Sequence, residues 1–144
     1  MKMKYNLPVF ILILGSLTYA QSGKIIVEIQ EFKNTKGLAR IVLFNQSEGF
    51  PSEYQFGIKS KSLNLDSTVI SAVFDSVDYG EYALSVLHDE NKNGKIDTNF
   101  IGIPREGYGV SNNINPKLRA PLFDEAMFLL NIPEIKINII LHYR

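Results

Sequence analysis

Apolar and polar residues alternate along several short segments of the chain, and this period of two predicts β-strands. Residues 24–32 and 134–143 show the alternation most regularly. The apolar positions of these two segments are Ile25, Val27, Ile29, Ile135, Ile137, Ile139 and Leu141. Residues 38–44, 67–74 and 81–87 are rich in branched and aromatic side chains, which are also typical of strands. We therefore expect most of the chain to form strands whose apolar faces meet in one core.

Glycine, proline and asparagine separate these segments and indicate how they connect. The turn at 34–37 joins the first two strands, which we expect to pair as a β-hairpin. Residues 55–62 have an ambiguous pattern that allows a short edge strand. Residues 122–131 contain helix-forming residues, but Pro121 and Pro133 bracket them, so we favour a strand over a short helix.

Six or seven short strands without a long helix predict an all-β fold, and more narrowly a single antiparallel β-sandwich of about seven strands. The sandwich domain is expected to cover residues 21–144. Tyr82 and Val86 share one face of their strand, so we expect both in the core. Phe50 could be an exposed binding aromatic, but we expect it to close one end of the core.

The first twenty residues have the features of a secretory signal peptide. A short basic region precedes an apolar stretch at 7–15. Thr18 and Ala20 then supply small residues at positions −3 and −1 of a cleavage site after Ala20. The apolar stretch falls short of the roughly 20 residues that a spanning helix needs, which disfavours an uncleaved membrane anchor. We expect a secreted or periplasmic protein that begins at Gln21 and meets the membrane only during export.

The charge of the mature chain argues against nucleic acid as a partner. Without the two lysines of the predicted signal, 13 basic side chains face 15 acidic ones, a net charge of −2. No basic surplus is therefore available to bind phosphate backbones or anionic lipid. The chain also has no cysteine, so an exported domain of this size relies on its core alone.

Residues 88–113 form the longest polar interruption of the chain, and their first part has the spacing of a calcium loop. Oxygen donors stand at alternate positions and Gly94 occupies the sixth position, where such a loop turns sharply. The candidate metal ligands are Asp89, Asn91, Asn93, Lys95 through its backbone carbonyl, and Asp97. Position twelve, which should supply a bidentate glutamate, is Phe100, so any calcium site is expected to be weak.

The same residues fit a loop that needs no metal. Asp and Asn side chains at alternate positions before a glycine also form Asx-turns, in which a side-chain oxygen accepts a hydrogen bond from the backbone two residues later. Both interpretations stay open, with the hydrogen-bonded loop slightly favoured. Zinc is less favoured than calcium, since His88 is the nearby nitrogen donor and cysteine is absent.

The second part of the polar segment offers side chains that suit a polar ligand such as a glycan or a peptide. The candidate ligand-binding residues are Arg105, Glu106, Tyr108, Ser111 and Asn112. Arginine provides a fork of donors and tyrosine an amphipathic ring. The alternative is that the flanking glycines make tight turns and that Tyr108 folds back onto the sandwich.

The chain has few features of an enzyme. His88 and Asp89 are neighbours on a predicted strand and therefore point to opposite faces, which does not make a catalytic pair. No nucleophile elbow and no phosphate-binding glycine loop occurs in the sequence. Asp89 and Glu106 could be paired carboxylates of a glycoside hydrolase, but the sequence does not place them together. We expect a non-catalytic protein.

The segment Phe74 to Val86, with a strand, a turn ending in glycine, and then tyrosine and alternating apolar residues, resembles transthyretin-like and carboxypeptidase-regulatory-like sandwiches. Extended through HDENKNGKIDTNFIGIPREGYGVSNN and on to Ala126, it resembles the domain of unknown function 2141 family of exported bacterial proteins. The resemblance covers essentially the whole mature chain. It implies a secreted or periplasmic transthyretin-like sandwich and no settled activity.

Two functions of different kinds remain from the sequence. The first is a binding or adhesion module of the cell envelope that presents the 88–113 loop to a polar ligand. The second is a structural or accessory domain in which this loop, calcium-bound or hydrogen-bonded to itself, only rigidifies one end of the fold.

Overall fold

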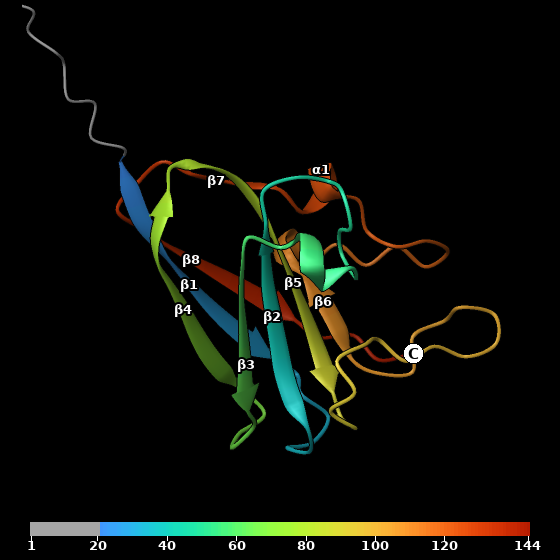
Figure 1. Cartoon of the computed structure of the whole chain (residues 1–144). Helices are drawn as coiled ribbons and strands as arrows, with labels where there is room; N and C mark the ends of the chain where they lie inside the picture. Colours follow the sequence, from blue (N-terminus) through green and yellow to red (C-terminus); the bar gives the residue numbers. More distant parts are fainter. Residues whose placement is uncertain (1–20) are drawn as a thin grey trace, which may run out of the picture.

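The computed structural model describes residues 21–144, which form two β-sheets packed face to face (Figure 1). The predicted signal peptide at 1–20 lies outside the described residues. The predicted all-β sandwich is confirmed, with eight strands rather than about seven. Among residues 21–144, no helix has the length and apolar character to span a membrane.

The first sheet has three strands in the order β4-β1-β8. The central strand β1 (Ser22–Gln30) pairs antiparallel with β4 (Ile70–Asp78) and parallel with β8 (Glu134–Ile140). The parallel pair departs from the purely antiparallel sandwich that the sequence predicts. It arises because β8 follows β1 by more than a hundred residues and is free to enter the sheet in either direction.

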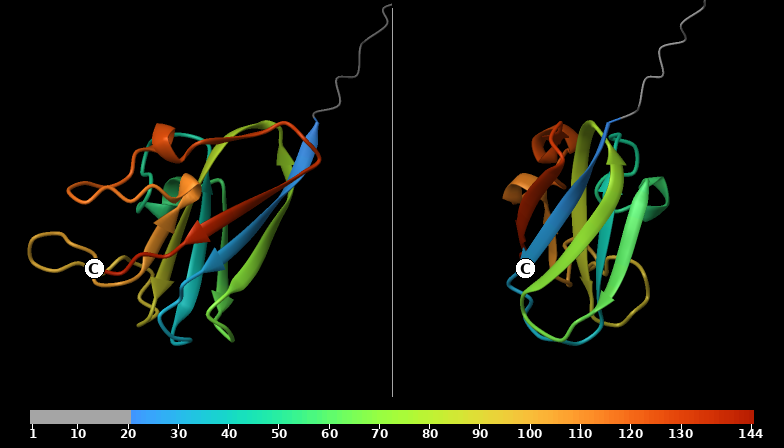
Figure 2. Two further views of the ribbon diagram at one scale, coloured as in Figure 1. Left: turned by 180° about the vertical axis from the view of Figure 1, so that it is seen from behind. Right: turned by 90° about the vertical axis from the view of Figure 1, so that its left-hand side faces the viewer.

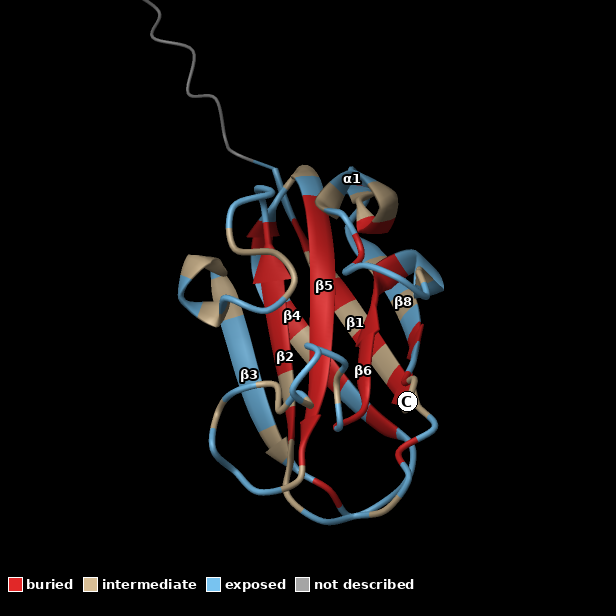
Figure 3. Cartoon of the chain, turned by 90° about the vertical axis from the view of Figure 1, so that its right-hand side faces the viewer, coloured by how far each residue is buried: buried red, intermediate tan, exposed pale blue. Residues whose placement is uncertain are grey.

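The second sheet is built around β5 (Gly80–Asp89), the longest strand. It follows the order β3-β2-β5-β6, and β7 pairs with the beginning of β5. The bounds of these strands are β2 (Leu38–Phe44), β3 (Lys59–Asn64), β6 (Tyr108–Val110) and β7 (Phe128–Leu130). Figure 3 shows β5 buried along nearly all of its length, because strands, loops and the opposite sheet cover both of its faces.

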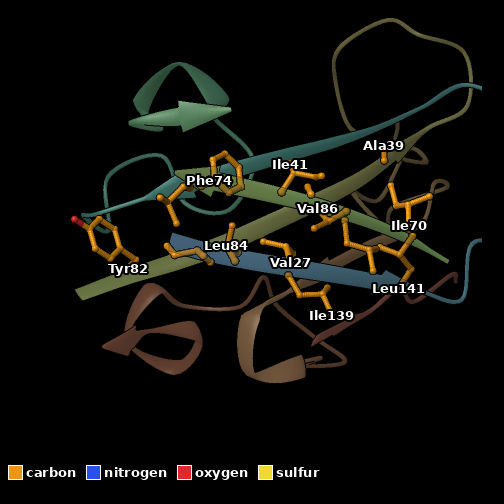
Figure 4. Packing of buried hydrophobic residues seen from close by; sticks show 14 of the residues in the cluster. Val27, Ala39, Ile41, Ile70, Phe74, Tyr82, Leu84, Val86, Ile139 and Leu141 are labelled. Atoms are coloured by element: carbon orange, nitrogen blue, oxygen red, sulfur yellow. The ribbon is translucent and has the colours of Figure 1, made fainter. Parts of the chain in front are cut away.

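The core fills the space between the two sheets (Figure 4). Ile25, Val27 and Ile29 are buried and the intervening side chains of β1 are not, which confirms the predicted alternation. Tyr82 and Val86 belong to the same cluster, as predicted. Phe50 is half-buried and packs on a smaller cluster around Ala83, Val110 and Ala126, at the outer face of β5. It therefore covers this outer face, and it packs edge-on against Phe44 and Phe123.

The predicted hairpin between 24–32 and 38–44 is wrong. β1 and β2 lie in different sheets, and the segment between them crosses the core with Phe32 buried. Hairpin partners in one sheet would turn their apolar faces to the same side. Here the apolar faces of β1 and β2 meet across the core instead, so each strand pairs elsewhere.

The predicted strand at 122–131 is only partly present. The short helix α1 (Phe123–Ala126) occupies its first half and β7 its second. The helix is one turn long because the Glu125 carboxylate accepts the N–H of Leu122 and Met127 returns the backbone to the extended region. The ambiguous segment 55–62 contains the start of the edge strand β3, after the 3₁₀ turn η1 (Tyr54–Phe56).

Candidate functional site

Three loops lie on the side of the sandwich away from the beginning of β1 (Figures 1 and 2). The 89–97 loop leaves the end of β5. The 98–104 loop and the 114–121 loop extend outward from the body of the fold, and we call these two the projecting loops. The C-terminal residue Arg144 lies at their base.

The 89–97 loop is anchored by Asp89, whose side chain is fully buried. Arg40, on the neighbouring strand β2, donates to its carboxylate and forms an ion pair with it. The backbone N–H groups of Asn93 and Gly94 donate to the same carboxylate at 3.0 and 2.9 Å. Burial alone would raise the pKa of Asp89, but Arg40 and these two backbone donors together hold that pKa below its usual range.

The other candidate metal ligands bond to one another. Asn91 and Asn93 accept hydrogen bonds from the backbone two residues later, which are the predicted Asx-turns. Their amide nitrogens donate to the two oxygens of Asp97 at 2.6 and 2.9 Å. Gly94 has a φ of +78°, which favours glycine, and it packs beside the Arg40 guanidinium. Each candidate side-chain oxygen therefore already accepts a hydrogen bond.

Glu106 also holds the 89–97 loop in place through hydrogen bonds to its backbone. Its carboxylate is buried and accepts the backbone N–H groups of Glu90 and Asp97 at 3.0 and 3.1 Å. Glu106 is one of the ligand-binding residues that the sequence predicts. The structure instead places it where it orders the backbone of the 89–97 loop.

His88 is buried on the opposite face of β5 from Asp89. One ring nitrogen, Nε2, lies 2.7 Å from the Lys36 carbonyl and must donate to it, because a carbonyl oxygen only accepts. The other, Nδ1, therefore accepts the hydroxyl of Tyr143 at 2.7 Å. The predicted separation of His88 and Asp89 onto opposite faces is confirmed.

Two more residues of the predicted ligand set serve the backbone around α1. Ser111 is fully buried, donates to the Ala126 carbonyl at 2.5 Å and accepts the N–H of Leu84 at 2.9 Å. Asn112 donates to the carbonyls of Glu125 and Met127. Both belong to the turn η2 (Ser111–Asn113), which holds α1 against β5.

The 98–104 loop is a tight turn held together by hydrogen bonds around Asn99. A bridge between Thr98 and Pro104 closes its base. The side-chain oxygen of Asn99 accepts the N–H groups of Ile101 and Ile103 at 3.0 and 2.9 Å. Gly102 adopts a φ of +82° in open space and donates to the Asn99 carbonyl. The turn consequently directs its apolar side chains into solvent, and Phe100 is 96% exposed.

The 114–121 loop is fixed at both ends by arginines. Arg144 donates to the carbonyls of Pro116 and Lys117 and to the side chain of Asn115. Arg119 makes a two-pronged pair with Glu125, which lowers the pKa of Glu125 to about 2 with help from the Leu122 N–H. Leu118, between these two anchors, is 99% exposed.

A depression of about 440 Å³ lies between the projecting loops. Tyr108 lines it, with its hydroxyl donating to Asn115 at 3.2 Å and the Arg144 guanidinium 5.8 Å above its ring. Arg105 lies at an adjoining depression that shares Lys117 and Arg144. We call the surface formed by Arg105, Tyr108, Lys117 and Arg144 the basic cleft.

The cations of the basic cleft are not neutralised by neighbouring carboxylates. The ion pairs found within residues 21–144 use Lys24, Lys33, Arg40, Arg119 and Lys136 instead. Neither projecting loop contains an acidic residue. The cleft therefore carries a local positive charge on a chain whose predicted mature form is net negative.

Arg105 and Tyr108 are thus the members of the predicted ligand set that lie at the cleft. Arg105 is exposed there, whereas Tyr108 is buried in β6, as the alternative of a ring folded back onto the sandwich predicts. Sequence reasoning missed Lys117, Arg144 and the pairing of Arg40 with Asp89. Arg40 had a signal, since it is the charged residue of an otherwise apolar strand segment. Arg144 had none, because only the fold brings the end of the chain to the 114–121 loop.

Within residues 21–144, no group of three or more His, Asp or Glu side chains is arranged as a metal site. Neither the curated proteins nor the solved structures contain a match to the chain. Residues 27–138, which cover more than half of the chain, match a family described as uncharacterised proteins conserved in bacteria. This match spans every element of the site except Tyr143 and Arg144 at the C-terminal end. The chain belongs to this family, DUF2141, as its sequence motif indicates.

Proposed function

We propose that the protein is an exported, non-catalytic binding module of the bacterial cell envelope that holds an anionic polar ligand in the basic cleft. An acidic glycan or an acidic stretch of peptide has the required chemistry. The expected ligand-binding surface is therefore the second part of the 88–113 loop, around Arg105, together with the 114–121 loop.

The observation that carries the proposal is the set of cations around Tyr108. Arg105, Lys117 and Arg144 border one surface without carboxylate partners among the described residues. Guanidinium groups bind carboxylate and sulfate oxygens in pairs, and a partly recessed surface screens such contacts less than a flat one does. Tyr108 is only 9% exposed, and its ring lies beneath the Arg144 guanidinium, so it supports this cation from the body of the fold.

The absence of catalysis is also part of the proposal. Both ring nitrogens of His88 and both oxygens of Asp89 bond to groups of the fold. Glu106 likewise orders backbone N–H groups. These are the titratable residues that the sequence offered for chemistry, and structural partners engage each of them. Export rests on the signal-like pattern of residues 1–20, which predicts a secreted or periplasmic location.

Calorimetric titration with oligogalacturonate, a polyanionic sugar, tests the proposal. Arg105→Gln and Lys117→Gln should each weaken binding about fivefold, since a charge-assisted contact at a partly exposed site is worth about 1 kcal/mol. Lys36→Gln, an exposed lysine in the loop before β2, is the control for the change in net charge and should bind as wild type does. Equal binding by all four proteins, or none by the wild type, would refute the proposal.

A second candidate function is that of a structural domain, and the hydrogen bonds of the 89–97 loop favour it. In this alternative the loop rigidifies one end of the sandwich and no ligand binds. Calcium binding by Asp89, Asn91, Asn93, Lys95 and Asp97 remains a prediction, in which the ion would replace the bonds from the two asparagine amides to Asp97.

A further inference from the structure

The tips of the projecting loops carry large apolar side chains in full contact with water. Phe100 and Leu118 are 96% and 99% exposed, and Ile101 is 65% exposed. Other exposed apolar residues, such as Val69 and Ile132, are only about half exposed and lie on separate turns. Scattered apolar residues on a surface are ordinary, but neighbouring tips exposed this completely mark an interaction surface.

The two tips belong to one surface. Residues of both loops line the depression between them, including Ile101 and Leu118, and the adjoining depression joins Phe100 to Lys117. Figures 1 and 2 show both loops extending in the same direction from the body of the sandwich. A planar partner could therefore contact both tips together.

Cations stand directly behind the apolar tips. Lys117 and Arg119 flank Leu118 in the sequence, and Arg105 and Arg144 lie at the base of the loops. Of these four, only Arg119 has an acidic partner among the described residues, Glu125. Apolar side chains thus lie at the tips of the projecting loops, and basic side chains lie between these tips and the body of the fold.

We propose that the projecting loops dock the protein on a lipid bilayer that contains anionic phospholipid. In this arrangement Phe100, Ile101 and Leu118 enter the boundary between headgroups and acyl chains, and the basic residues meet the phosphates. Apolar side chains bury about 5–10 Å into this boundary, and each nearby basic residue adds roughly fivefold to the affinity. This goes beyond the proposed function, which concerns a soluble ligand, although the two share basic residues. It also departs from the expectation that the protein meets the membrane only during export, because the local charge of these loops, rather than the net charge of the chain, faces the bilayer.

The backbone of the 98–104 loop suits entry into a poorly hydrated layer. Free N–H groups are costly there because no water bonds to them. Asn99 accepts the N–H groups of Ile101 and Ile103, and the Asn99 carbonyl accepts that of Gly102. The apolar side chains can therefore leave water without stranding these three backbone donors. A protein partner could itself bond to free N–H groups, whereas acyl chains cannot, so this internal bonding favours the bilayer.

Vesicle partitioning tests the inference, because the chain has no tryptophan and Phe100→Trp introduces a single reporter. The exported protein carrying this change should show blue-shifted emission with vesicles of phosphatidylglycerol and phosphatidylcholine, and brominated lipid should quench it. Val69→Trp, on a distant turn, is the control and should not respond. An unshifted, unquenched emission for Phe100→Trp in the presence of vesicles would overturn the proposal.

Sedimentation with the same vesicles gives an independent measure. Phe100→Ser combined with Leu118→Ser should lower partitioning about a hundredfold or more, since each of the two buried apolar side chains contributes at least about tenfold. Lys117→Gln should lower it about fivefold, whereas Ile132→Ser should leave it unchanged. Partitioning by the double variant equal to wild type would overturn the proposal, as would a self-association of the wild type that the double variant abolishes.

Oligogalacturonate separates the two proposals. The double variant keeps every cation of the basic cleft, so its affinity for the sugar should fall far less than its partitioning into vesicles. Wild-type protein that binds the sugar but no vesicles would overturn membrane docking and leave the proposed function standing. Wild-type protein that binds vesicles but not the sugar would do the reverse.

Discussion

The 89–97 loop and the projecting loops are all connections that contain glycine or proline, yet they use their side chains in opposite ways. In the 89–97 loop the charged and amide groups satisfy one another, and the anchoring carboxylate is fully buried. In the projecting loops the asparagine side chains and Arg119 are bonded within the fold, while Phe100, Leu118 and Lys117 face solvent. The difference suggests that the first loop is a support and the others are the surface it supports.

The largest expected effect is a loss of folding stability when Arg40 is replaced. Arg40→Met leaves the buried Asp89 carboxylate without its cation, and loss of one partner of a buried pair costs on the order of 3 kcal/mol. The matched change Arg105→Met removes an exposed arginine and should alter the free energy of unfolding by less than about 0.5 kcal/mol. Urea unfolding of the two variants measures both values. Equal losses would show that the two regions do not differ as described.

A smaller effect is expected in the pH dependence of stability. The pKa of Asp89 is lower in the folded chain than in the unfolded one, so between these two values the unfolded chain binds the proton. The stabilisation is therefore complete above about pH 4, the ordinary pKa of the side chain, and is lost as pH falls through the folded pKa. Urea midpoints of wild type should fall more steeply below this pH than those of Asp89→Asn. Parallel curves would contradict the assignment.

How far the sequence predicts this molecule depends on the range over which each signal acts. The alternation in β1 and the Asx-turn spacing of Asn91 and Asn93 are local patterns, and the structure contains both. The hairpin prediction failed because pairing is decided by which apolar faces must meet across the core, and local turn residues carry no information about that. The basic cleft was missed for a related reason, since Arg144 reaches Tyr108 only through the parallel strand β8 and the residues after it.

The roles of the predicted ligand-binding residues also depend on the fold and not on residue type. Arg105, Glu106 and Asn112 have equally polar side chains and neighbouring positions, so composition could not separate them. Only the backbone path decides that Glu106 turns inward to bond with N–H groups while Arg105 stays in solvent. Residue type therefore indicated the region and not the roles within it.

The smallest expected effect is that of calcium on the melting temperature. Because each side-chain oxygen of the 89–97 loop already accepts a hydrogen bond, we expect no shift in millimolar calcium. Asp97→Ala should then cost only about 1 kcal/mol for each hydrogen bond removed. A ligand that binds only the native state must raise the melting temperature. A rise with calcium that Asp89→Ala abolishes would establish the metal site instead.

The contrast between support and binding surface is tested most directly by nuclear magnetic resonance of the ¹⁵N-labelled protein titrated with oligogalacturonate. Amide shifts are predicted at Arg105, Lys117 and Arg144 and in the backbone of the projecting loops, while the amides of the 89–97 loop stay in place. Shifts concentrated in the 89–97 loop, or none across the protein at saturating sugar, would contradict the account.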